Sequence, residues 1–141
     1  AASPEASANG LASFRGRAAG AVTSATPVAL GVSIQVESQG EATHLGRFTR
    51  TEVLLLDPAT NTFAGLVAFT TASGDTLTGL VSGGFVSQTS ATGTYRFTGG
   101  TGRFEEAGGW ASFSLTSEDG IHFAVAFKGA IEGVAGGRGK P

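Results

Sequence analysis

The polar side chains best placed to do chemistry lie on a predicted strand over residues 44–56. Strand alternation puts the following residues on one face: His44, Gly46, Phe48, Arg50, Glu52 and Leu54. If that face points inward, an Arg50–Glu52 pair would orient a substrate, and a buried glutamate would have a raised pKa suited to acid–base catalysis. If it points outward, the pair is solvated and contributes little energy. We expect an outward or rim placement, because charged side chains usually stay in contact with water.

Arg50 and Glu52 are the only candidates for catalysis, and whether the chain is an enzyme stays open. Phe48 shares their face and is a candidate for ligand binding. Glu37 ends an otherwise apolar strand, which predicts a place at the mouth of a closed barrel. Tyr95 is the sole tyrosine and acts either as a phenolic donor in a pocket or as a packing residue. Trp110, the sole tryptophan, is expected to line the mouth or to cover the end of the sheet.

Several function classes are disfavoured by composition. Cysteine is absent, and the two histidines, His44 and His122, begin strands far apart in the sequence, so we expect no metal site and no cofactor. The string Gly-Leu-Val-Ser-Gly at residues 79–83 misplaces the serine of a hydrolase elbow. The net charge is −2, with nine scattered Lys and Arg, which argues against nucleic-acid binding. The sequence contains no apolar run of about 18 residues, so it predicts no membrane span. It also shows no basic amphipathic helix that would bind a membrane surface.

The elements that must position these residues are strands. The 141 residues include 23 glycines and many Thr and Val, which disfavours long helices. Period-two alternation with turn signals predicts eight strands, near residues 14–23, 28–37, 44–56, 62–71, 76–86, 93–98, 110–116 and 121–132. We expect an all-β, closed, eight-stranded antiparallel up-and-down barrel of the calycin-like kind over residues 11–133. A two-sheet sandwich is the alternative. Residues 1–10 and 134–141 are expected to be a flexible lead-in and tail.

The glycine-rich stretch FTGGTGRFEEAGG, residues 97–109, is interpreted as architecture. It lacks the third glycine and the following helix of a dinucleotide loop, so phosphate binding is not expected. Gly99 and Gly100 allow a strand to bend or to approach another backbone closely. Residues 103–107, after Gly102, are expected to form a single helical turn that Gly108 ends in a left-handed conformation. Phe104 is expected to plug one end of the core.

This stretch resembles the G-G-[ST]-G-x-[FY] segment shared by allene oxide cyclases and dirigent proteins, and the resemblance extends over roughly residues 14–132. A second stretch, GEATHLGRFT at residues 40–49, is similar to one in uncharacterised exported bacterial proteins of that barrel class. The resemblance implies a closed eight-stranded antiparallel barrel, often trimeric in the plant members. It also implies action on small, mostly apolar molecules in the lumen, as cyclases or as guides for radical coupling. No functional residue is carried over, because no pocket motif aligns outside the glycine segment.

Two functional hypotheses follow. The first is a barrel that binds a small, mostly apolar molecule in its lumen, with cyclase-like or stereo-directing activity as its extension. The second is a non-catalytic, exported structural or interaction protein whose barrel is filled. The start AASPEASANG resembles the stump left after signal-peptide cleavage, which predicts a secreted or periplasmic protein. The low charge and the two-sided apolar run at residues 53–56 predict a homo-oligomer.

Overall fold

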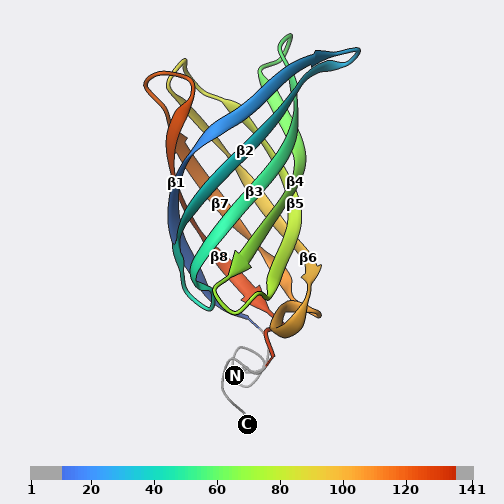
Figure 1. The fold of residues 1–141 in the computed structure, drawn as a ribbon, viewed down its shortest axis with the longest axis vertical. Helices are drawn as coiled ribbons and strands as arrows, with labels where there is room; N and C mark the ends of the chain where they lie inside the picture. The colour runs from blue at the N-terminus through green and yellow to red at the C-terminus, as the bar shows by residue number, and fades with distance from the viewer. Residues whose placement is uncertain (1–10, 136–141) are drawn as a thin grey trace.

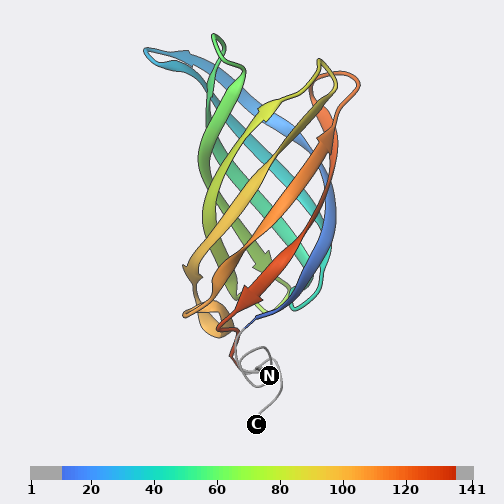
Figure 2. The same ribbon diagram turned by 180° about the vertical axis from the view of Figure 1, so that it is seen from behind.

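The chain folds as a closed barrel of eight antiparallel strands in sequence order, as Figures 1 and 2 show. The computed structural model describes residues 11–135, so the expectations for residues 1–10 and 136–141 lie outside it. The strands are β1 (Ala12–Val28), β2 (Gly31–Ala42), β3 (Gly46–Asp57), β4 (Thr62–Thr71), β5 (Thr76–Phe85), β6 (Ser90–Gly100), β7 (Gly108–Thr116) and β8 (His122–Glu132). Pairing of β1 with β8 closes the sheet. The predicted closed barrel is confirmed, and the sandwich alternative is wrong.

The β1–β2 hairpin is longer than the alternation predicts. The first strand was expected to end at Thr23, but β1 runs through Pro27 and continues to Val28. Its pairing with β8 stops at Ala21, whereas its pairing with β2 continues to the hairpin turn. Beyond Ala21 the β8 side of β1 has no partner strand, and a proline is tolerated at such an edge because no ladder donor is lost there.

One half of the barrel interior is filled by aromatic rings. Phe14 packs edge-on against Phe97 at a centroid distance of 5.1 Å, and Phe48 packs against Phe69 at 5.2 Å. Phe127 stacks on Phe14 at 5.5 Å. These side chains are buried and belong to the same core cluster. Edge-to-face packing of this kind adds to the hydrophobic gain of burial, so this half forms the stable base of the molecule.

The glycine-rich stretch closes the same end of the barrel. It forms a short 3₁₀ helix, η1 (Gly102–Phe104), and Phe104 is fully buried, as expected. Asp75 in the β4–β5 turn holds it, with its Oδ2 3.3 Å from Arg103 Nε. The expected left-handed Gly108 is wrong. It is Gly109 that has a positive φ, of 119°, because Gly108 already starts β7 and the irregular step falls one residue later.

A matched pair of glycine substitutions tests this account of the closure. A Cβ on Gly109 would lie 2.2 Å from the backbone oxygen of Ala130, whereas one on Gly46, also at positive φ, meets nothing within 4 Å. Gly46→Ala should lower the free energy of unfolding by about 1 kcal/mol through backbone strain. Gly109→Ala should lower the free energy of unfolding by about 3 kcal/mol or more, because backbone strain and a clash with the neighbouring backbone combine. Urea unfolding measures both, and equal losses would contradict the close approach of β7 and β8.

Candidate functional site

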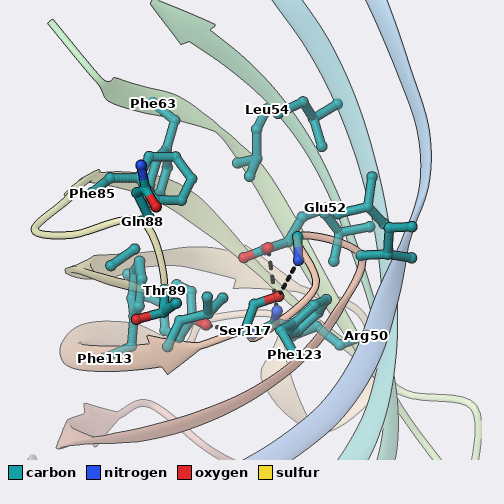
Figure 3. A pocket seen from close by; sticks show the side chains of 18 residues that line it. Arg50, Glu52, Leu54, Phe63, Phe85, Gln88, Thr89, Phe113, Ser117 and Phe123 are labelled. Carbon is teal, nitrogen blue, oxygen red and sulfur yellow. Dashed lines mark hydrogen bonds and ion pairs between the residues drawn. The ribbon is translucent and has the colours of Figure 1, made fainter. Parts of the chain in front are cut away.

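The other half of the barrel interior holds a cavity of about 110 Å³. It lies toward the end that carries the β1–β2, β3–β4, β5–β6 and β7–β8 turns, which we call the mouth end (Figure 1). All eight strands contribute to its lining. The apolar side chains that carry the argument are Ile34, Leu54, Phe63, Phe113, Leu115 and Phe123. Figure 3 shows rings and aliphatic chains around the space, with Arg50 and Glu52 close together at one side of it. The cavity is therefore an apolar chamber with a single strongly polar region.

That polar region is a three-residue cluster that joins two strands on opposite sides of the barrel. Arg50 and Glu52 come from β3 and Tyr95 comes from β6. Arg50 Nη2 lies 3.2 Å from Glu52 Oε1, and Arg50 Nη1 donates a hydrogen bond to Tyr95 Oη. The guanidinium carbon also lies 5.7 Å from the centroid of the Tyr95 ring and 5.9 Å from that of Phe123. The cluster forms the floor of the cavity, because the packed aromatic half begins at the neighbouring inward residue, Phe48.

The expected outward or rim placement of Arg50 and Glu52 is wrong. Their side chains are only 1% and 6% exposed. The alternation on β3 was ambiguous, and the structure turns the face with Phe48 and Leu54 inward and the face with Val53 and Leu55 outward. The cost of burying the charged guanidinium is reduced because it has an anionic or hydrogen-bonding partner on two sides and aromatic faces around it.

Burial governs the protonation of this cluster. Desolvation raises the pKa of Glu52 above its ordinary value of 4.5, and the nearby Arg50 cation only partly opposes that rise. Desolvation likewise raises the pKa of Tyr95, so its phenol keeps its proton at physiological pH. Arg50 Nε is buried and has no hydrogen-bond partner among the described residues. The floor is consequently rich in hydrogen-bond donors, and it suits a ligand that presents an acceptor oxygen.

The remaining residues proposed from the sequence do not line the cavity. Phe48 is buried in the aromatic half. Glu37 is exposed between the buried Val36 and Ser38, so it points away from the lumen and the expected mouth position is wrong. Trp110 is 53% exposed and its neighbour Ala111 is buried, so it lies on the outer wall and neither lines the mouth nor covers an end. Only Arg50, Glu52 and Tyr95 are brought together.

Sequence reasoning missed most of the lining. Alternation identifies which residues share a face, but it does not say which half of a barrel is empty, so Phe63, Phe113 and Phe123 looked like ordinary core. Gln88 and Thr89 reach the cavity from the β5–β6 turn and Ile121 from the β7–β8 turn. Turn residues show no periodicity, so no sequence signal was available for them.

The potential metal ligands of residues 11–135 do not form a cluster. Within this range no group of three or more metal-ligating side chains comes together. His44 lies in the turn between β2 and β3, and His122 lies at the mouth end, where its Nδ1 is 2.8 Å from Asp119 Oδ2. No helix in this part of the chain is long and apolar enough to cross a membrane.

Comparison with known proteins supports the fold. No protein-family model matches the chain, and no curated protein does either. Among solved structures, the pterocarpan synthase dirigent protein GePTS1 is similar, with a TM-score of 0.66 over 89% of each chain and 15% sequence identity. The chain thus has a dirigent-like eight-stranded barrel, and this part of the resemblance is confirmed at the level of the fold. The likeness to allene oxide cyclases and to exported bacterial proteins stays a prediction.

Proposed function

We propose that the protein binds a small, mostly apolar molecule with an acceptor oxygen in the mouth half of its lumen. The observation that carries the proposal is an apolar chamber whose buried polar groups are concentrated in one donor-rich cluster at its floor. Ligand sites typically combine apolar walls with a few polar groups that fix orientation. The cavity of about 110 Å³ is small beside the roughly 300–1,000 Å³ of pockets for drug-sized ligands. It suits a molecule of about one ring or a short chain.

The same arrangement supports a stereo-directing role. Arg50 and Tyr95 would hold the ligand oxygen at the floor, while Phe63, Phe113 and the other walls would restrict the rest of the molecule to few orientations. Holding a reactive molecule in one orientation selects among its products without any proton transfer by the protein. A cyclase-like reaction would in addition use Glu52 for proton transfer, because burial raises the pKa of this carboxyl above its ordinary value. The similar fold of a pterocarpan synthase dirigent protein is an analogy that supports this role.

The alternative, a structural protein with a filled barrel, is less well supported. The half that contains Phe14, Phe69 and Phe127 is filled, but the mouth half contains a cavity and a buried ion pair. A purely structural core gains little from a buried ion pair, since apolar residues of similar volume are often at least as stabilising. The buried cluster therefore favours a binding function.

We also propose that copies of the chain associate through the outer wall of β3, β4 and β5. Val53, Leu66 and Leu80 lie directly opposite one another in the strand register, and Leu66 is 60% exposed. Between residues 58 and 95 the only charged residue is Asp75, which lies in the β4–β5 turn. Arg96 on β6 lies opposite Leu80 at one edge of the stripe, and Arg47 and Asp57 lie at the two ends of β3. The stripe itself is apolar, so this wall suits a homo-oligomer.

Binding is tested with a pair of single-ring probes. 4-Methylphenol should bind more tightly than toluene by about fivefold to tenfold, because it adds roughly one hydrogen bond at the floor. Amide shifts in nuclear magnetic resonance titrations should map to the strands around Arg50, Tyr95 and Phe123. Tyr95→Phe should reduce the preference for 4-methylphenol, while Trp110→Phe on the outer wall should leave it unchanged. No binding of either probe, or shifts confined to the outer wall, would contradict the proposal.

The raised pKa of Glu52 predicts a specific dependence of stability on pH. A folded protein that holds this proton more tightly than the unfolded chain loses stability as the pH rises from 4.5 through the folded-state pKa. Glu52→Gln lacks this titration, so its free energy of unfolding relative to the wild type should rise over that interval. Urea unfolding from about pH 4 to about pH 8 measures the difference. A relative stability that falls as the pH rises would show instead that Glu52 is ionised and paired with Arg50.

The association surface is tested by charge insertion. Leu66→Asp places a charge in the centre of the apolar stripe and should convert the oligomer to a monomer in sedimentation velocity runs. Ala126→Asp, on the exposed outer face of β8, is the matched control and should leave the oligomer intact. A wild-type protein that sediments as a monomer at high concentration would overturn this part of the proposal.

A further inference from the structure

The two ends of the barrel differ in the side chains that they expose. Among residues 11–135, the exposed large hydrophobic side chains at the mouth end are Val28, Leu30, Phe85, Val86 and Ile121. Toward the opposite end the corresponding set is Leu11 and, on the outer wall near the start of β7, Trp110. Leu30 is 79% exposed and Val86 is 65% exposed. Figures 1 and 2 show the turns of the mouth end together at the top of the barrel, with η1 at the bottom. These exposed apolar side chains, which we call the apolar tips, are therefore concentrated at the mouth end.

These tips are continuous with the cavity. Phe85 and Ile121 are exposed to solvent and also line the chamber. Val22 and Ile34, at the base of the β1–β2 hairpin, line it as well. From Thr23 to Val28 the β1 side chains are all exposed, so this part of the hairpin stands free of the barrel wall. An apolar molecule can thus pass from the tips to the chamber along apolar side chains.

The mouth end is rich in carboxylates. Asp57 ends β3 and Glu118 and Asp119 lie in the β7–β8 turn, while the mouth turns contain no Lys or Arg. The nearby basic group is His122, whose Nδ1 lies 2.8 Å from Asp119 Oδ2. Asp119 accepts hydrogen bonds from the backbone N–H groups of Ile121 and His122 at 2.8 and 2.7 Å, which keeps its carboxylate beside an exposed apolar tip. An acidic rim repels a negatively charged surface and is compatible with a neutral, zwitterionic one.

We propose that the mouth end docks on a neutral, zwitterionic lipid surface, from which the apolar ligand enters the cavity. The proposal rests on the proposed function in one respect, that the ligand is apolar. Lipid fits better than a protein partner because the apolar groups stand on separate turns. Separate apolar side chains can each insert among lipid headgroups, whereas a protein interface requires a contiguous, closely packed patch.

The test is flotation with vesicles of dioleoylphosphatidylcholine. The wild-type chain should float with them, and Leu30→Asp should lower the partition coefficient at least tenfold. Leu11→Asp changes an exposed leucine at the opposite end and should have no effect. Replacing about a third of the lipid with phosphatidylglycerol should weaken binding at low ionic strength, and added salt should restore it. A wild-type chain that stays unbound, equal losses in the two variants, or tighter binding to the anionic vesicles would overturn the proposal.

Two further measurements separate docking from the other proposals. Leu30 does not line the cavity, so Leu30→Asp should bind 4-methylphenol in solution as the wild type does. Wild-type chains that bind this probe but do not float would refute docking and leave the proposed function standing. Sedimentation without lipid tests whether a second copy of the chain, and not lipid, contacts the exposed apolar side chains of the mouth end. A loss of self-association in Leu30→Asp would identify the mouth as a contact between copies and would overturn the lipid surface.

Discussion

A guanidinium buried in the middle of a small barrel is the constraint on which the rest of the structure depends. Arg50 requires partners inside the lumen, and it finds Glu52 on its own strand and Tyr95 across the barrel. No apolar side chain can replace these partners without leaving an unpaired charge, which costs far more than the pair contributes. The cluster therefore divides the interior. Rings fill the half beyond Phe48, and the half beyond Leu54 keeps a chamber.

Strand alternation explains how much of this could be predicted. A barrel wall is apolar inside and solvated outside, so the period of two identified eight strands and their order, and β4 was placed at its observed bounds. It failed on β3, where Arg50 and Glu52 alternate with Val53 and Leu55. Both faces of this strand mix apolar and polar residues, because one carries a site and the other an outer wall with exposed valine and leucine side chains. Whether a strand face points into the barrel depends on the residues that surround it in three dimensions. The local sequence pattern does not specify those neighbours.

The same reasoning accounts for the other errors. Glu37 and Trp110 were judged by residue type, a carboxylate at a strand end and a lone indole, yet the period of two places both outside the barrel beside buried neighbours. The cavity-lining residues of the β5–β6 and β7–β8 turns could not be predicted from the sequence, because turns lack periodicity. Residue chemistry suggested candidates correctly only where the fold also brought them together, as it did for Arg50, Glu52 and Tyr95.

The difference between the two ends of the barrel links its stability to its proposed function. The closed end is tied by η1, by the Arg103–Asp75 pair and by the aromatic core, so it carries the rigidity of the fold. The mouth end has none of these ties, and its β1–β2 hairpin extends beyond the last pair with β8. A backbone hydrogen bond of 2.9 Å from Ser117 N–H to Thr89 O joins two of the mouth turns, so the hairpin tip beyond Ala21 is the part of this end that can move without disturbing the packed half. Arg50 lies at the boundary between the two halves, where the packed half can fix the orientation of a ligand that enters from the mouth end.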